Sequence, residues 1–410
     1  MLKNYFKIAI AVLKRRKFFT FISLFGISFT LTIIMVVSAF MDDVFSANYP
    51  DTNRDRSLYV NAIRQENVKK GYNQMGPASF HFFNHYVGQL KTPEKVAVSS
   101  TFQPSNTYVN NKKLVINQKY TNADYWNVLQ YNFIEGKPYG KQQVDNGERV
   151  AVISEETRDS YFGGGQVVGK YIETDNVQYR VIGVVGNVPV TRFLVYSDIY
   201  LPYTVSKNDY REKRLYGSYT GILMAKSQED VDKMRQEFDA MAAKIPVENK
   251  EFDKVYVHAD GYLASFTRQM IGSNTNSGLA RFFLIISIIA LLFMLLPTLN
   301  LVNINISRIM ERSSEIGVRK AFGASSKTLV YQFIVENIIL TFIGGAIGIL
   351  LSYIALQFIN SSDLLANLDL KINGNVLSYS LVACLLFGLL SGVYPAWRMS
   401  RLHVVTALKA

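Results

Sequence analysis

Residues 311–324 read Glu-Arg-Ser-Ser-Glu-Ile-Gly-Val-Arg-Lys-Ala-Phe-Gly-Ala and form a short charged segment between two long apolar runs. The segment is compatible with a helix, on which Glu315 and Arg319 are one turn apart and can form an i,i+4 ion pair. Ile316 and Phe322 add apolar side chains to it. At a membrane surface, such a helix would present a mixed apolar and charged face, and we expect this face to contact another protein. The alternative is an ordinary solvated loop between two membrane spans.

The composition predicts a membrane protein that also contains a large polar domain. Of the 410 residues, 49% are hydrophobic, yet the mean hydropathy of +0.09 is only slightly positive. Four apolar stretches are long enough to cross a hydrocarbon core of about 30 Å. The first is too long for a removable signal peptide and is followed by a polar insert, and the other three lie close together near the C-terminus.

The basic residues predict the orientation in the membrane. Fourteen Lys and Arg residues, against only two acidic ones, lie before the first span, between the second and third spans, and after the fourth. These segments therefore carry the whole net charge of +12, and the positive-inside rule places them in the cytoplasm. The insert is then outside the cell membrane. Because it has no basic excess, nucleic-acid binding is not expected.

The insert reads as a mixed α and β domain. Strand-like runs occur at residues 58–63, 113–119, 149–153 and 179–185, and apolar residues recur at helical spacing over 231–241. Cys384 is the only cysteine in the chain and lies in the fourth span, so no intramolecular disulfide is expected.

Two separate stretches resemble the MacB-like or FtsX-like permeases, which are membrane subunits of ABC transporters that work as mechanotransmitters. Residues 311–324 are similar to the family's ER-x-x-EIG-x-R-K-A-x-GA segment, although Ser313 and Ser314 replace a frequent Thr and Arg. Residues 150–185 are similar to the core of the family's periplasmic domain, with a strand, a short helix, Phe-Gly, a Val-Gly-Lys turn and a second strand. The C-terminal Tyr394-Pro395-Ala396 also resembles the end of that family.

The resemblance and the hydropathy together imply an α+β architecture. It consists of a four-helix transmembrane domain with a large mixed α/β periplasmic domain inserted between the first and second spans. The expected segments are a cytoplasmic amphipathic helix (1–17), span one (18–41), the periplasmic domain (42–278), span two (279–306), the cytoplasmic coupling segment (307–328), span three (329–359), a short periplasmic loop (360–375), span four (376–396) and the cytoplasmic C-terminus (397–410). The first segment could equally be the plain cytoplasmic start of span one.

A glycine cluster in the insert imitates a phosphate-binding loop. Gly164-x-x-x-x-Gly169-Lys170 is followed by Tyr171, whereas a P-loop needs Ser or Thr at that position and a helix after it. These glycines are therefore expected to form a turn. His81 and His85 share a helical spacing, but two histidines alone make a poor zinc site, so no metal site is predicted.

Within the spans, the sequence predicts packing rather than catalysis. Small-residue pairs allow close approach of helices, a proline kinks its helix, and a membrane-embedded asparagine bonds across helices. The candidates are Pro297, Asn303, Gly344, Gly348, Gly388 and Gly392. Glu336 is either a functional intramembrane carboxylate or, as preferred here, an interfacial carboxylate paired with Arg319 or Lys320.

The resemblance implies a bacterial inner-membrane, multi-pass permease that is not an enzyme and binds no cofactor itself. ATP and Mg²⁺ would bind a cytoplasmic ABC ATPase dimer, which must be a separate subunit because the chain shows no nucleotide-binding domain. Further implied partners are a second permease copy or a paralogue and, as in many members, a periplasmic adaptor and an outer-membrane channel. The residues expected to couple to the ATPase are Glu311, Arg312, Glu315, Ile316, Gly317, Arg319, Lys320, Ala321, Gly323 and Ala324.

The implied function is export or extraction of a periplasmic or membrane substrate, such as a peptide, lipoprotein, drug or toxin. A competing hypothesis is a membrane-anchored sensor or regulator of a kinase or a cell-wall hydrolase. A surface-anchored enzyme would need a catalytic constellation, and the sequence contains no recognisable nucleophile motif.

Overall fold

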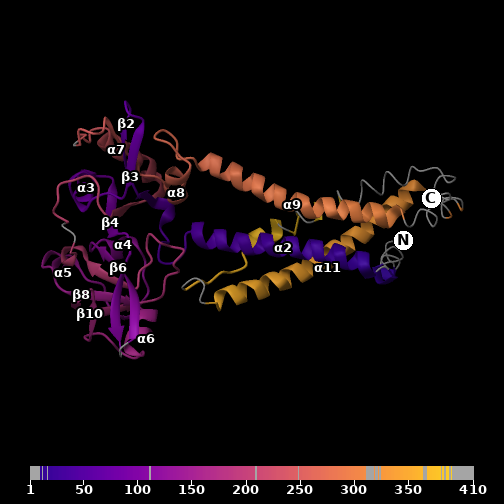
Figure 1. Ribbon diagram of the computed structural model, residues 1–410, viewed down its shortest axis with the longest axis horizontal. Helices are drawn as coiled ribbons and strands as arrows, with labels where there is room; N and C mark the ends of the chain where they lie inside the picture. Colours follow the sequence, from indigo (N-terminus) through magenta and orange to yellow (C-terminus); the bar gives the residue numbers. More distant parts are fainter. Residues whose placement is uncertain are drawn as a thin grey trace. The chain divides into compact units, whose positions relative to one another are not determined.

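The computed structural model describes residues 10–11, 13–15, 17–109, 112–207, 210–247, 249–310, 318, 322, 325–362, 367–379, 381–382, 385–386 and 389 (Figure 1). Its contacts divide the chain into two units. The helical unit comprises Met1–Asp43, Phe283–Leu364 and Asp369–Ala410, and the sheet unit comprises Val44–Phe282 and Leu365–Leu368.

The sheet unit is built on a ten-stranded mixed sheet, sheet A. Its strand order is β1-β12-β4-β6-β11-β8-β10-β7, with β5 beside β6 and β9 beside β10. The β10–β8 and β11–β6 pairs are parallel and the remaining pairs are antiparallel. The strands are β1 (Ser57–Val60), β4 (Pro93–Ser100), β5 (Gln103–Val109), β6 (Lys112–Thr121), β7 (Phe133–Gly136), β8 (Val150–Ser154), β9 (Tyr171–Thr174), β10 (Val177–Val185), β11 (Ile199–Pro202) and β12 (Tyr219–Ala225).

Both faces of sheet A are buried, which explains why β8, β11 and β12 are apolar almost throughout. Successive side chains of β1 enter different cores, with Leu58 and Val60 in one cluster and Tyr59 in the other. Helices α3 (Phe80–His85) and α7 (Val231–Ala242) contribute to the first core. Helices α4 (Tyr125–Val128), α5 (Lys141–Asp145) and α8 (Tyr262–Met270) contribute to the second.

A second, three-stranded sheet, sheet B, has the order β13-β2-β3 and consists of β2 (Ile63–Asn67), β3 (Tyr72–Gly76) and β13 (Lys254–Val257). The prediction that residues 58–63 form one strand is wrong, because β1 ends at Val60 and β2 begins at Ile63. The chain changes sheet at Asn61 and Ala62, and there the side-chain Nδ2 of Asn61 donates to the Ser265 hydroxyl. The other three predicted strands and the predicted helix are confirmed by β6, β8, β10 and α7.

The glycine cluster forms a turn, as expected. It follows α6 (Glu155–Phe162), whose C-cap residue Gly163 has a φ of +74°. Gly164, Gly165 and Gly169 also have positive φ, a conformation that costs glycine little. Strand β9 rather than a helix follows the cluster, so no helix N-terminus faces it as in a P-loop.

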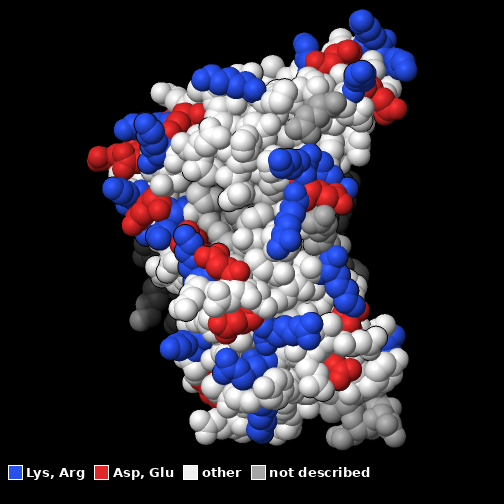
Figure 2. Space-filling model, turned by 90° about the vertical axis from the view of Figure 1, so that its left-hand side faces the viewer, with Lys and Arg blue, Asp and Glu red and all other residues white. Residues whose placement is uncertain are grey.

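On one face of the sheet unit, charged side chains of both signs lie close together. Figure 2 shows Lys and Arg interspersed with Asp and Glu over one face, without a continuous basic field.

The helical unit contains long apolar helices (Figure 1). Its elements include α2 (Lys17–Phe45), α9 (Leu279–Met310) and α11 (Ser326–Asn360), the first two of which continue into the sheet unit. Among the described residues, two helical stretches are long and apolar enough to span a membrane, Lys17–Phe45 and Ile334–Asn360, and Leu279–Leu292 is a shorter apolar stretch.

Helices α2 and α11 approach closely at two glycines. A Cβ atom on Gly344 would lie 2.8 Å from the Ile27 side chain, and one on Gly348 would lie 2.9 Å from the Leu31 side chain. Thr32 Oγ1 also donates to the Gly348 carbonyl at 3.3 Å. The side of α2 that carries Ile27 and Leu31 is buried within the unit, so the missing side chains permit this contact.

We predict that Gly348→Ala destabilises the protein, because the added methyl group clashes with Leu31. Gly26→Ala is the matched control, since no atom lies within 4 Å of a Cβ at that helical position. There alanine should be neutral or stabilising, as it favours helix more than glycine. Thermal unfolding of the detergent-solubilised chain measures both changes, and an equal response of the two variants would contradict the packing argument.

A second prediction concerns Lys119, which is buried in β6 with 1% of its surface exposed. Its Nζ donates to the carbonyls of Ser100 and Leu194, each at 3.0 Å, and burial lowers its pKa to about 7. The unfolded chain, in which lysine has a pKa near 10.4, binds more protons than the folded protein above pH 7. Stability contributed by this site therefore rises between pH 7 and 9.

We expect Lys119→Met to flatten this rise, whereas Lys113→Met, at an exposed position of the same strand, should preserve it. The measurement is the melting temperature of each variant from pH 7 to 9. A wild-type melting temperature that is constant or falls over this range would refute the assignment of a neutral buried amine.

Candidate functional site at the ends of α2 and α9

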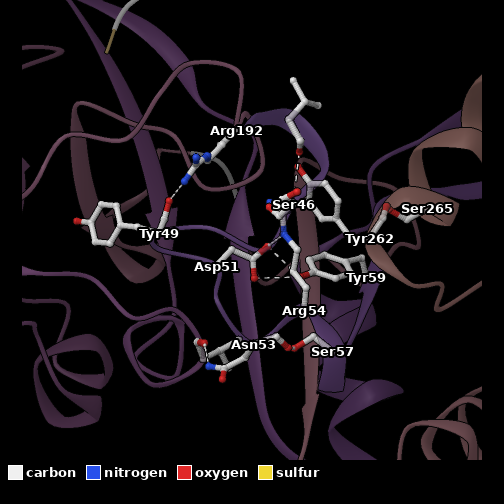
Figure 3. Close-up of polar contacts among 12 residues, drawn as sticks. Ser46, Tyr49, Asp51, Asn53, Arg54, Ser57, Tyr59, Arg192, Tyr262 and Ser265 are labelled. Atoms are coloured by element: carbon white, nitrogen blue, oxygen red, sulfur yellow. Dashed lines mark hydrogen bonds and ion pairs between the residues drawn. The ribbon is translucent and has the colours of Figure 1, made fainter. Parts of the chain in front are cut away.

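The sheet unit holds the chain where it leaves α2 through Arg54 (Figure 3). Arg54 Nη1 donates to the carbonyl oxygens of Ser46 at 2.6 Å and Val44 at 3.5 Å. The last carbonyls of a helix lack partners within the helix, and a cation near them is favourable. Arg54 thus caps the C-terminal end of α2.

Asp51 balances the charge of Arg54. Arg54 Nε donates to Asp51 Oδ2 at 2.8 Å, and the side chains are 6% and 2% exposed. The Tyr59 hydroxyl donates to the same carboxylate at 2.9 Å (Figure 3). Burial and the neighbouring Asp51 carboxylate raise the pKa of Tyr59 well above its usual value, so Tyr59 remains a neutral donor. The pair is therefore fixed to β1.

Tyr262 of α8 completes the cluster. Its ring centroid lies 3.4 Å from Cζ of Arg54, and it packs edge-to-face against Tyr59 with centroids 5.1 Å apart. A guanidinium over an aromatic ring is stabilised by about 2 kcal/mol or more when desolvated. We call Asp51, Arg54, Tyr59 and Tyr262 the junction cluster.

The junction cluster is continuous with the segment that leads into α9. The backbone groups of Tyr59 and Asp260 exchange two hydrogen bonds, at 2.7 and 3.1 Å. Arg268 of α8 donates to the Asp260 carboxylate and to the Ser273 carbonyl at 2.9 Å. At Gly278, immediately before α9, φ is +75° and a Cβ would lie 2.9 Å from the backbone of Gly272. This turn is therefore tightly packed up to the start of α9.

A second set of contacts holds the segment after α2 from another side. The Tyr49 hydroxyl donates to the Gly186 carbonyl at 3.1 Å, and Arg192 donates to the Tyr49 carbonyl (Figure 3). The Gln130 amide donates to the Pro50 carbonyl at 2.8 Å. Residues 49–54 are thus bound to loops next to β7 and β10 as well as to β1.

Sequence reasoning missed the junction cluster, because its members follow no recognised motif. The available signal was weak: a polar Asp51-x-x-Arg54 pair at i,i+3 directly after an apolar span. Tyr262 lies 208 positions from Arg54 in the chain, so its role becomes apparent only from the fold.

The predicted coupling residues lie outside the described residues, so their role stays a prediction. They are Glu311, Arg312, Glu315, Ile316, Gly317, Arg319, Lys320, Ala321, Gly323 and Ala324. The same holds for Gly388 and Gly392, while Pro297 and Asn303 lie within α9, with only their backbone described.

Two further predicted residues or pairs are described. Glu336 is buried in α11 with 1% of its surface exposed, but its preferred partners Arg319 and Lys320 lie outside the described residues. The rings of His81 and His85 stack with centroids 5.1 Å apart on α3. Within the described part of the chain, no group of three or more His, Cys, Asp and Glu side chains could hold a metal ion.

Comparison with known proteins identifies two family regions. Residues 20–241 match the MacB-like periplasmic core domain, and residues 287–404 match the FtsX-like permease C-terminal domain. The first match alone spans more than half of the chain.

Curated relatives include macrolide export ATP-binding/permease proteins MacB. MacB 2 of Yersinia pestis bv. Antiqua (strain Antiqua) is 27% identical over 292 residues, which cover 70% of this chain and 40% of that protein. MacB of Escherichia coli (strain K12) is 27% identical over 315 residues, which cover 73% and 44% respectively. The chain thus spans less than half the length of these relatives.

Solved structures of related outer domains are similar at low identity. The periplasmic region of MacB from Actinobacillus actinomycetemcomitans aligns with a TM-score of 0.37 and 16% identity, covering 56% of this chain and 96% of that one. A domain of a putative permease protein from Porphyromonas gingivalis aligns with a TM-score of 0.41 and 15% identity, covering 52% and 92%. On the strength of the two family matches, the chain belongs to the MacB-like, FtsX-like family of ABC transporter permeases.

Proposed function

We propose that this chain is the permease subunit of an ABC transporter and transmits ATP-driven motion of a separate cytoplasmic ATPase to its outer domain. The observation that carries the proposal is the junction cluster. Two apolar helices, α2 and α9, meet the sheet unit in segments held by buried ionic and aromatic contacts. Close-packed contacts of this kind transmit displacement rather than absorb it.

In the proposed assembly, the chain spans the bacterial inner membrane four times, with both termini in the cytoplasm. Segment 307–328 docks on an ABC ATPase dimer, and a second permease copy or a paralogue completes the pair. ATP and Mg²⁺ bind the ATPase, and this chain performs no catalysis. Family membership and the basic charge of these segments support this arrangement.

The proposed cargo is a periplasmic or membrane substrate that is exported or extracted, in the class of peptides, lipoproteins, drugs or toxins. The curated relatives are named for macrolide export, which supports an export role. A periplasmic adaptor and an outer-membrane channel would extend the path of such a cargo.

The first test reverses the charges of the coupling segment. We expect the double variant Glu315→Arg/Arg319→Glu to insert normally but to lose ATP-dependent movement of the outer domain, because the mixed face no longer complements the ATPase. The measurement is the distance between spin labels at exposed Lys141 in the two permease copies, with and without ATP.

The matched control is Glu229→Arg/Lys233→Glu, an exposed pair with the same spacing in the sheet unit. It should move as the wild type does. Normal movement in the Glu315/Arg319 variant, or purification with a histidine kinase instead of an ATPase, would rule out the proposed coupling and favour a sensor.

The second test breaks the junction cluster without touching the coupling segment. Tyr262→Leu removes the ring that lies over Arg54 and should cost about 2–3 kcal/mol of local stability, whereas Tyr262→Phe keeps the ring. We expect the leucine variant to bind the ATPase and hydrolyse ATP normally but to show reduced outer-domain movement in the same spin-label measurement. If Leu and Phe variants move alike, the cluster does not transmit motion.

A further inference from the structure

A cavity of about 40 Å³ lies between sheet B and α8, wholly within the sheet unit. Its first wall is one cross-strand row of sheet B, in which Met75 of β3, Arg64 of β2 and Tyr256 of β13 stand directly opposite each other. Side chains paired in this way lie on the same face of a sheet. The row therefore presents one guanidinium between two apolar groups.

The second wall is one face of α8. Ser265, Arg268 and Gln269 line the cavity at helical spacing, and Arg268 is paired with the Asp260 carboxylate. The charge of Arg268 is thus compensated.

Asn61, which is 8% exposed, is a buried polar residue of the lining. Asn61 Nδ2 donates to Ser265 Oγ at 2.7 Å, and Ser265 Oγ donates its single proton to the Tyr262 carbonyl at 2.7 Å. Because Ser265 can then only accept from Asn61, the amide orientation is fixed. Asn61 Oδ1 is left as a buried acceptor without a partner among the described residues.

His258 and Arg64 also line the cavity. Each has a buried nitrogen atom without a hydrogen-bond partner among the described residues. The backbone of Asn274 forms a hydrogen bond with the His258 ring, and His258 Nε2 has no partner in the described chain. The bond to Asn274 therefore involves Nδ1. Burial, aided by the charge of Arg268, lowers the pKa of His258, so the ring is neutral near pH 7 and Nε2 is an acceptor. Arg64 Nε is a donor that has no acceptor among the residues that the structure describes.

We propose that this cavity binds a primary carboxamide group. A carboxamide offers two N–H donors, for Asn61 Oδ1 and His258 Nε2, and one oxygen that accepts from Arg64 Nε. A carboxylate has no proton to donate to Asn61, and an ammonium group cannot accept from Arg64. The volume also fits, since about 10–15 Å³ is needed per water-sized group and a carboxamide has three non-hydrogen atoms.

The carboxamide could belong to an Asn or Gln side chain of a polypeptide or to a small free amide, which share this chemistry. The binding itself does not rest on the transmission role. Because Ser265 and Arg268 belong to α8, the ligand would join sheet B to the helix that precedes α9.

The test uses the full chain in lipid nanodiscs and saturation-transfer NMR with acetamide as the probe. Acetone is the size-matched comparison, because it accepts a hydrogen bond but donates none. We expect acetamide to bind at least about fivefold more tightly than acetone, since only acetamide satisfies the two buried acceptors. Equal binding of both probes, or no acetamide signal, would overturn the proposal and leave a cavity filled by water.

Two variants localise the site. Arg64→Met removes the donor and Ala62→Leu fills the cavity, and each should weaken acetamide binding at least about fivefold. Arg180→Met, at an exposed position of β10, is the matched control and should bind as the wild type does. Unchanged binding in both cavity variants would also overturn the proposal.

Competition then identifies the source of the carboxamide. If the peptide Gly-Gly-Gln-Gly-Gly displaces acetamide, the site accepts a polypeptide side chain. If N-acetylated Gly-Gly-Ala-Gly-Gly and the Gln peptide both fail while free glutamine succeeds, the site takes a small amide.

Discussion

The buried ion pair of Arg54 and Asp51 fixes the segment between α2 and β1 within the sheet unit. Removing two charged groups from water costs several kcal/mol each, and only good geometry with further hydrogen bonds offsets this cost. Here the Arg54 guanidinium also caps α2 and packs on Tyr262, and the Asp51 carboxylate also accepts from Tyr59. Each partner is therefore costly to displace alone. The arrangement favours one position of the chain after α2.

Tyr59 links the Arg54–Asp51 pair to sheet A. Tyr59 belongs to β1, whose neighbouring side chains are buried in cores on both faces of sheet A. A displacement of the Arg54 segment would thus have to move the edge of a closely packed sheet. Protein interiors are close-packed and transmit strain. Such a displacement would therefore be passed on to the rest of the sheet.

Sequence patterns predicted the local elements and missed the contacts between distant ones. Strands β8 and β10 and helix α7 follow from periodicity within short windows. The pattern of 58–63 predicts one strand, but the chain changes sheet at Asn61, whose side chain bonds to Ser265 more than two hundred positions away, and no local pattern contains that contact. Likewise, the glycine spacing indicated close packing at Gly344 and Gly348, but only the structure identifies Ile27 and Leu31 as the side chains they meet. The coupling role of residues 307–328 stays a prediction from their sequence.

Helix α2 packs against α11 at Gly344 and Gly348, and its C-terminal carbonyls are capped by Arg54. Both sets of contacts suit the proposed transmission of motion. Helix α11 begins at Ser326, inside the predicted coupling segment, and the Ser325 hydroxyl accepts from the Thr328 amide at its N-terminus. It meets α2 at Gly344 and Gly348, and α2 ends at the carbonyls that Arg54 caps. The 29 residues of α2 form one uninterrupted helix, about 44 Å long at 1.5 Å per residue. Described contacts thus join α11 to α2 at Gly344 and Gly348, and join the end of α2 to β1 through Arg54 and Asp51.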